Sequence, residues 1–348
     1  MGMPEIIIEF QSKAGAAVGI GQRGVVALIL KDSTKTTFDT KEYNAFDEVT
    51  AADWTAKSYD YIKQAFLGAP RRVIVERLAP SAVNYSDALK RLKTKRWNWL
   101  AVPELNTAGR DEIKMYIQNT RTVNKGTFKA VIANCAAGNE GVVNFVASDI
   151  AIENKTYSAE DYTPRIAGIF AGLPLDRSAT FYPLPEVVSI TEPANPDADI
   201  SAGKLILVND GAKIKIARAV TSHIGSPELR KVKIVEGQDI IKGDIRDVFN
   251  DFYVGKVLNT YDNKIMFLAA CNAYLTELEG LGVLDPGFDN RLEIDIAAQR
   301  NYLAGKNVDV SSLGEQELKE YNTGSRVFLS GAVKFADAME DMQLKIEM

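Results

Sequence analysis

Few side chains in this sequence of 348 residues have the types and spacing that enzymatic chemistry requires. It contains a single histidine, His223, and no serine, cysteine or carboxylate stands at a recognisable motif spacing from it. A nucleophile–histidine–acid triad or a metal centre needs such partners. We therefore predict no catalytic residue, no metal ligand and no cofactor.

Carboxylates are grouped between residues 285 and 295, which makes calcium binding or acid–base chemistry one interpretation of that stretch. The members of this group are Asp285, Asp289, Glu293 and Asp295. The alternating ligands of an EF-hand loop are absent. Glu293 and Asp295 alternate with apolar residues of a predicted strand, so we expect them on a solvated surface.

The stretch Gly19-Ile20-Gly21-Gln22-Arg23-Gly24 has the spacing of a dinucleotide-binding loop. It supports the main alternative prediction, a soluble α/β nucleotide-binding enzyme. Such a loop must open a helix whose N-terminus holds the pyrophosphate. Here the β-branched run 25–30 follows, which is typical of a strand, so we favour a flexible hinge. The glycines assigned to this hinge are Gly15, Gly19, Gly21 and Gly24.

A basic and aromatic stretch, Lys90 to Trp99, has the composition of a nucleic-acid platform. Basic residues also stabilise the last turn of a helix, and the two tryptophans begin the next predicted strand. The formal net charge of the whole chain is -5, which does not favour a polyanionic partner. We predict no direct contact with nucleic acid.

The composition is that of an ordinary soluble globular protein, with 46% hydrophobic and 25% charged residues. No apolar run is long enough for a membrane span, and the first residues lack the cationic region of a signal peptide. Cys135 and Cys271 lie far apart without ligand spacing, so we expect free thiols in a reducing compartment. These features predict folding in the cytosol and no membrane partner.

Two kinds of domain are predicted on either side of a proline-rich loop near residue 195. Residues 25–195 alternate helices and strands, which indicates an α/β domain with a largely parallel sheet. Residues 196–348 form an α+β domain, with Asn209-Asp210-Gly211 as a hairpin signal. Its other predicted strands are 231–236, 291–297 and 326–335, and its helices are 239–252 and 262–281. Residues 1–24 form an N-terminal strand and hinge that join this second domain.

Both ends of the chain have the pattern of strands. The N-terminal run is Glu5, Ile6, Ile7, Ile8, Glu9 and Phe10, and a small-residue connector, 14–17, follows it. The C-terminal run alternates strictly and comprises Met342, Gln343, Leu344, Lys345, Ile346 and Glu347. Two interpretations remain open at this point. The runs pair with each other inside one subunit, or each completes the sheet of a neighbouring copy.

The order of several short motifs resembles the tail sheath proteins of contractile bacteriophages and phage-like bacteriocins. The matching stretches are 168–172 (GIFAG), 203–211 (GKLILVNDG), 216–220 (IARAV), 230–235 (RKVKIV), 252–256 (FYVGK), 274–278 (YLTEL) and 334–341 (KFADAMED). The resemblance extends over residues 160–348 and includes the N-terminal strand. Within that family the chain resembles a compact member, similar to the sheaths of defective prophages and bacteriocins of Gram-positive bacteria.

This resemblance implies a structural protein that polymerises helically around a tail tube and contracts to drive the tube through a target cell envelope. The inner α+β domain would contain both termini, and the α/β domain would be an outward-facing insertion. Terminal arms would exchange strands between copies. The implied acceptor strand, 326–335, includes Arg326, Val327, Phe328, Leu329, Val333 and Phe335.

The implied partners are further copies of the chain, the tail tube protein, and baseplate and tail terminator proteins. Assembly in the cytoplasm of a bacterial host is expected, followed by release through lysis within a phage tail or bacteriocin particle. A second alternative is another phage structural protein, such as the inner tube. Tube proteins are usually much shorter β-barrels, so length and the α/β alternation disfavour it.

Overall fold

The computed structural model describes residues 18 and 23–347, and the chain forms two compact units. Of the described residues, the sheet unit comprises 23–240 and 337–347, and the helical unit comprises 18 and 241–336. Within the described part of the chain, no helix is both long and apolar enough to cross a membrane. The fold is a mixture of α/β and α+β structure, as the sequence predicts.

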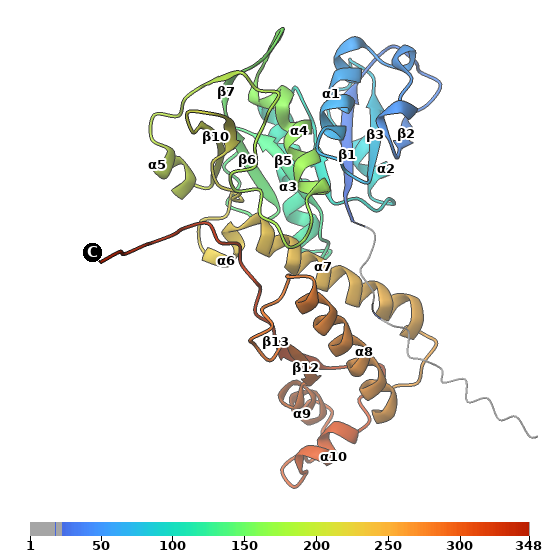
Figure 1. Ribbon diagram of the computed structural model, residues 1–348. Coiled ribbons are helices and arrows are strands. Elements are labelled where there is room, and N and C mark those ends of the chain that lie inside the picture. Colours follow the sequence, from blue (N-terminus) through green and yellow to red (C-terminus); the bar gives the residue numbers. More distant parts are fainter. Residues whose placement is uncertain (1–17, 19–22, 348) are drawn as a thin grey trace, which may run out of the picture. The chain divides into compact units, whose positions relative to one another are not determined.

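The sheet unit is built on eight strands in the order β11-β10-β6-β5-β4-β1-β3-β2 (Figure 1). Six central strands are parallel: β1 (Val25–Lys31), β3 (Arg72–Leu78), β4 (Trp99–Ala101), β5 (Lys129–Ala133), β6 (Val142–Val146) and β10 (Lys204–Asn209). The edge strands β2 (Thr40–Tyr43) and β11 (Ile214–Ile216) pair antiparallel. The β10–β11 hairpin turns at Asn209-Asp210-Gly211, where Gly211 has a φ of 89°, so this prediction is confirmed.

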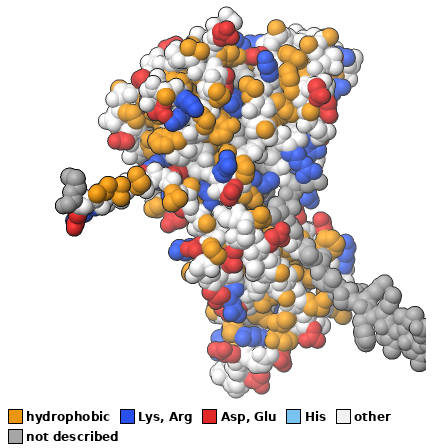
Figure 2. Space-filling model, in the orientation of Figure 1, with side chains coloured by type: hydrophobic (Ala, Val, Ile, Leu, Met, Phe, Trp, Pro, Cys, Tyr) orange, Lys and Arg blue, Asp and Glu red, His pale blue; other side chains and the backbone are white. Residues whose placement is uncertain are grey.

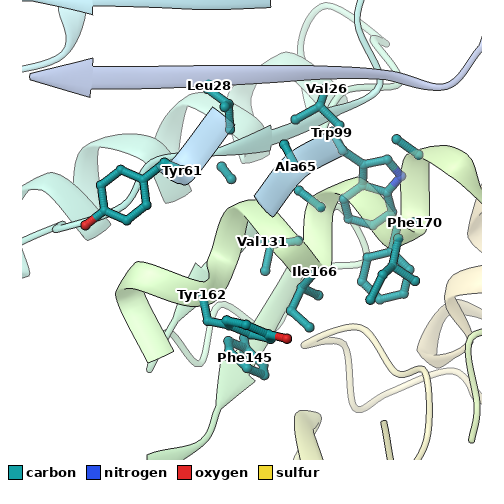
Figure 3. Packing of buried hydrophobic residues seen from close by; sticks show 14 of the residues in the cluster. Val26, Leu28, Tyr61, Ala65, Trp99, Val131, Phe145, Tyr162, Ile166 and Phe170 are labelled. Carbon is teal, nitrogen blue, oxygen red and sulfur yellow. The ribbon is translucent and has the colours of Figure 1, made fainter. Parts of the chain in front are cut away.

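Helices cover both faces of this sheet, because alternate residues of each buried strand point to opposite sides. In β1, Val26 and Leu28 face α1 (Ala56–Phe66) and α4 (Ala159–Gly172), and Figure 3 shows this core around Ile166 and Phe170. Ala27 and Ile29 belong to the second core. That core includes α2 (Ser86–Leu92) and α3 (Thr107–Thr122).

Three glycines allow α1 and α4 to approach backbone to backbone. A Cβ added at Gly168 would lie 2.1 Å from the carbonyl oxygen of Ala65, and one at Gly172 would lie 1.9 Å from that of Gly68. A Cβ at Gly68 would lie 2.0 Å from the carbonyl carbon of Gly168. The GIFAG motif at 168–172 is therefore a helix-packing motif of the sheet unit.

Shorter elements complete the sheet unit. A three-stranded sheet has the order β8-β7-β9. The remaining elements are β7 (Ser148–Ile152), β8 (Lys155–Tyr157), β9 (Ser189–Thr191), the helices α5 (Pro196–Ser201) and α6 (Pro227–Arg230), and the turns η1 (Phe46–Glu48) and η2 (Ala51–Asp53).

The helical unit contains one small sheet and several helices. Helix α7 (Val232–Val248) starts in the sheet unit and passes into this unit after Ile240, and a π-helical turn, η3 (Phe249–Tyr253), continues it. The other helices are α8 (Tyr261–Gly280), α9 (Ile296–Ala304) and α10 (Glu315–Glu320). Strands β12 (Arg291–Ile294) and β13 (Leu329–Ala332) form an antiparallel pair.

Three predicted features differ from the structure. Of residues 231–236, predicted as a strand, Lys231 forms an isolated bridge with Val220 and the other five residues open α7, because a short β-branched run has no period that separates strand from helix. The strand predicted over 291–297 ends at Ile294, and Asp295 caps α9 by accepting from the N–H of Ala298 at 2.8 Å. The compact units divide after residue 240 rather than near 195, because β10 and β11 pair into the large sheet.

Candidate assembly surfaces

The residues singled out for chemistry have structural contacts. His223 accepts a hydrogen bond at its Nε2 from the N–H of Ser226, 2.9 Å away, which closes a local turn. Asp285 forms an ion pair with Lys334 at 2.9 Å. In the parts of the chain that the structure describes, no group of three or more His, Cys, Asp or Glu side chains could hold a metal ion.

The basic and aromatic stretch 90–99 does not present its tryptophans to solvent. Trp97 is buried and stacks on Phe128, with ring centroids 4.0 Å apart and an interplanar angle of 8°. The Trp99 side chain is 1% exposed and packs against Phe170. Bases cannot stack on rings that already lie in a core. The stretch instead joins the end of α2 to the start of β4.

The glycine loop leads into a strand. Gly24 has a φ of 83°, its carbonyl accepts from the N–H of Arg71 at 2.8 Å, and β1 begins at the next residue. A nucleotide loop would have to open a helix here, so the enzyme alternative is not favoured. Gly15, Gly19 and Gly21 lie outside the described residues, and the hinge stays a prediction.

Both cysteines are buried free thiols. Burial raises the pKa of Cys135 above its usual value and raises that of Cys271 to about 11. Thiols with raised pKa values are poor nucleophiles at neutral pH.

The predicted acceptor strand, 326–335, is regular over only part of its length. Strand β13 occupies Leu329 to Ala332, and Val333 lies just beyond it. Phe335 forms an isolated bridge with Leu284, and the ring of Phe328 packs on Tyr302 at 5.3 Å. Arg326 and Val327 lie before the strand, in the segment that leads into it.

One edge of the small sheet is capped and the other is open. On the outer edge of β12, the side-chain amide of Asn272 accepts from the N–H of Leu292 at 2.8 Å and donates to its carbonyl at 3.1 Å. In this antiparallel register, the main-chain groups of Leu329 and Gly331 point away from β12. Among the described residues, no strand pairs with that edge of β13.

The C-terminal run 342–347 forms neither helix nor strand. Its apolar side chains lie in solvent, with Met342 88%, Leu344 69% and Ile346 75% exposed (Figure 2). Gln343, Lys345 and Glu347 alternate with them and are also exposed. The N-terminal run, Glu5 to Phe10, lies outside the described residues.

Ion pairs fix the root of the C-terminal run to the sheet unit. Glu340, whose side chain is 8% exposed, accepts from the hydroxyl of Ser178 at 2.8 Å. Arg218 donates to Asp341 at 2.5 Å, and this hydrogen bond raises the pKa of Arg218. Lys231 pairs with Asp337. These contacts explain the acidic residues of the KFADAMED motif, and we name them the root clamp.

A buried ionic cluster, which the sequence did not indicate, holds the first turns of α7 at the amino ends of β4 and β5. Arg121 binds Asp239 through two nitrogens, at 2.8 and 3.0 Å, and Lys129 reaches the same carboxylate at 2.8 Å. Trp99 donates its indole N–H to Glu236 at 2.6 Å. Burial alone would lower the pKa of Arg121, but its carboxylate neighbours raise it.

The root clamp and the ionic cluster were missed because their partners are distant in sequence. Arg218 and Asp341 are separated by 123 positions, and Arg121 and Asp239 by 118. A charged residue on a buried helical face, such as Asp239 in α7, is the signal that could have indicated the cluster, since a buried charge needs a partner.

Comparison with known proteins matches two regions of the chain to one family. Residues 79–222 match the phage tail sheath protein central domain, and residues 225–348 match the phage tail sheath C-terminal domain. The whole chain is 36% identical over 362 aligned residues to a tail sheath protein of Clostridium phage phiCD119, with 99% of that relative covered.

Solved structures share the fold at low sequence identity. The contracted helical sheath of the anti-feeding prophage aligns with a TM-score of 0.73 and 11% identity, over 100% of this chain and 99% of that chain. The sheath tail protein of Desulfitobacterium hafniense aligns with a TM-score of 0.71 and 15% identity, over 84% and 94%. With a relative matched along its whole length and two matching domains in order, this chain belongs to the phage tail sheath family.

Proposed function

We propose that the chain is the structural subunit of a contractile tail sheath, without a catalytic role. Copies polymerise helically around a tail tube, and contraction drives the tube through a target cell envelope. The observation that supports this most directly is the combination of an open β13 edge with an exposed, alternating tail on the same chain. Each copy thus has a tail that can be donated as a strand and a β13 edge that can accept one. Because the donor and acceptor surfaces differ, copies join head to tail in an open heterologous assembly.

Strand donation provides the linkage between copies. A donated strand forms main-chain hydrogen bonds with an edge and places alternate side chains against the acceptor. The arms are 5–10 and 342–347, the acceptor is 326–335, and the glycines between residues 15 and 24 are the hinge. Such links allow subunits to rotate and slide during contraction without separating.

The helical unit, together with the two terminal arms, is assigned to the inside of the sheath next to the tube, and the α/β region is the outward-facing insertion. The partners are further copies of the chain, the tube protein, the baseplate and the tail terminator. Assembly takes place in the cytoplasm of a bacterial host, and lysis releases the finished phage tail or bacteriocin particle.

Negative-stain electron microscopy of the purified protein, alone and with its tube protein, tests this proposal. We expect hollow striated cylinders of uniform width. Deletion of residues 342–348 should leave a folded monomer that forms no ordered polymer, and Ile7→Pro should weaken assembly because proline removes a ladder donor. Dispersed monomers of the unaltered chain under both conditions would overturn the proposal.

A further inference from the structure

An apolar groove of about 440 Å³ lies in the helical unit at the amino end of β13. Its walls come from η3, the segment after it, the start of α8 and the segment that leads into β13. The residues used below are Tyr253, Val257, Leu258, Asn259, Lys264 and Val327. The volume is in the range of pockets that bind a specific ligand.

The rim of this groove is unusually apolar for a surface. Leu258 is 78% exposed, Val254 is 53% exposed and Val257 is 39% exposed. Exposed apolar side chains gathered around a concave site favour an apolar occupant, because covering them removes hydrocarbon from water.

Polar groups inside the groove have unused bonding capacity. The hydroxyl of Tyr253 and the side-chain oxygen of Asn259 are buried and have no partner among the described residues. Lys264, only 3% exposed, is the charged residue of the lining. Among the described residues, its ammonium group has one long contact, 3.4 Å from the carbonyl of Tyr321. A buried cation with one weak partner favours an occupant that brings a carboxylate.

We propose that the groove binds the end of the C-terminal tail of a second copy, with Ile346 on the apolar wall and Glu347 toward Lys264. This inference rests on the proposed strand donation. The root clamp holds the start of the tail on its own copy, so the free end is the part that reaches a neighbour. The groove adjoins the amino end of β13, and the donated strand is therefore antiparallel to β13.

The register between the donated tail and β13 follows from the lengths of the two segments. When Met342 lies opposite Ala332, four tail residues pair with the four residues of β13. The ladder ends at Leu329, so Ile346 and Glu347 lie beyond the amino end of β13 and are free of its alternation. They lie next to Val327, a residue that lines the groove. A parallel strand would direct the end of the tail away from the groove.

Disulfide cross-linking between two full-length proteins tests the groove. One protein has Ile346→Cys and the other has Leu258→Cys, so only a contact between copies gives a product. We expect a cross-linked dimer in the polymer, and none when Val83→Cys, at a 94% exposed position of the sheet unit, replaces Leu258→Cys. A polymer without the 346–258 product would overturn the groove assignment while leaving the sheath function intact.

A binding assay below the polymerisation threshold separates the two proposals. A fluorescent peptide of residues 336–347 is added to the full chain, and its anisotropy is measured. Leu258→Asp should weaken binding at least tenfold, and Val83→Asp should leave it unchanged. Lys264→Met should lower the affinity of the natural peptide and not that of a peptide with Glu347→Gln.

If the natural peptide and the Glu347→Gln peptide bound equally well to the unaltered chain and to Lys264→Met, the proposed contact between Glu347 and Lys264 would be wrong. If the peptide bound to Leu258→Asp as tightly as to the unaltered chain, the groove would not be its binding site. Failure of the unaltered chain to polymerise, with normal peptide binding, would instead contradict the sheath function. A protein with both Ile346→Cys and Leu258→Cys that cross-links only within itself would show that the tail binds its own copy.

Discussion

The two sheets of this molecule differ in how completely they are paired. In the eight-stranded sheet, β1 lies between two parallel neighbours and has helices on both faces, so almost all of its side chains are buried. In the small sheet, β13 has one neighbour among the strands that the structure describes, and Gly331 and Ala332 are exposed. Isolated two-stranded sheets are marginal in water. The large sheet therefore stabilises the subunit by its own pairing and burial, whereas one edge of the small sheet has no strand partner among the described residues.

The strongest test of this division is Asp239→Ala in the buried ionic cluster. Arg121 would keep Glu140 and Lys129 would keep Glu236, but both cations would lose the buried carboxylate that they share, which costs about 3–5 kcal/mol. We expect a large fall in the urea midpoint of the sheet unit. As a control, Lys90→Ala in the exposed Lys90–Asp87 pair should change it little. Equal midpoints for both variants would contradict the central role of the cluster.

A somewhat smaller loss is expected for Gly168→Ala. The added methyl group would lie 2.1 Å from the carbonyl oxygen of Ala65, so α1 and α4 must separate, at a cost of about 3 kcal/mol. Gly243→Ala is the matched control within α7, where nothing lies within 4 Å, and it should stabilise slightly. Thermal melting followed by circular dichroism measures both. Similar melting temperatures for the two variants would show that α1 and α4 can separate without cost.

For the open edge we expect the opposite pattern, in which stability changes little and assembly is lost. Leu329→Pro removes an N–H that points away from β12, and proline is tolerated at such an edge position. The melting temperature should stay within a few degrees, while sedimentation and microscopy should show no polymer. Ser330→Ala, whose main-chain groups pair with β12, should assemble normally. A normal polymer from Leu329→Pro would mean that β13 accepts no strand.

The smallest effect on stability is expected at the root clamp. Glu340→Gln keeps the shape of the side chain but weakens its contacts with Arg218 and Ser178. The fold should be unaffected, and protease cleavage near Met339 should become faster because the root is held less tightly. Unchanged cleavage rates at low salt would show that the clamp does not restrain the tail.

Sequence patterns predicted much of this molecule because its local signals agree with its fold. Asn209-Asp210-Gly211 produced the expected hairpin, and the helix predicted over 262–281 is α8. The order of the motifs predicted the sheath family, which the comparisons confirm. Local signals failed at 231–236, where burial against the sheet unit selected a helix.

The sequence by itself determined the alternation of helices and strands, the exposed strand pattern of the tail and the family. Each of these depends on residues close together in the chain, or on motif order. Only the tertiary structure decided that β13 has an open edge, that Asn272 caps β12 and that Glu340 binds Ser178. These contacts join residues that are distant in sequence. The local pattern of apolar and polar residues does not predict which distant residues come into contact when the chain folds.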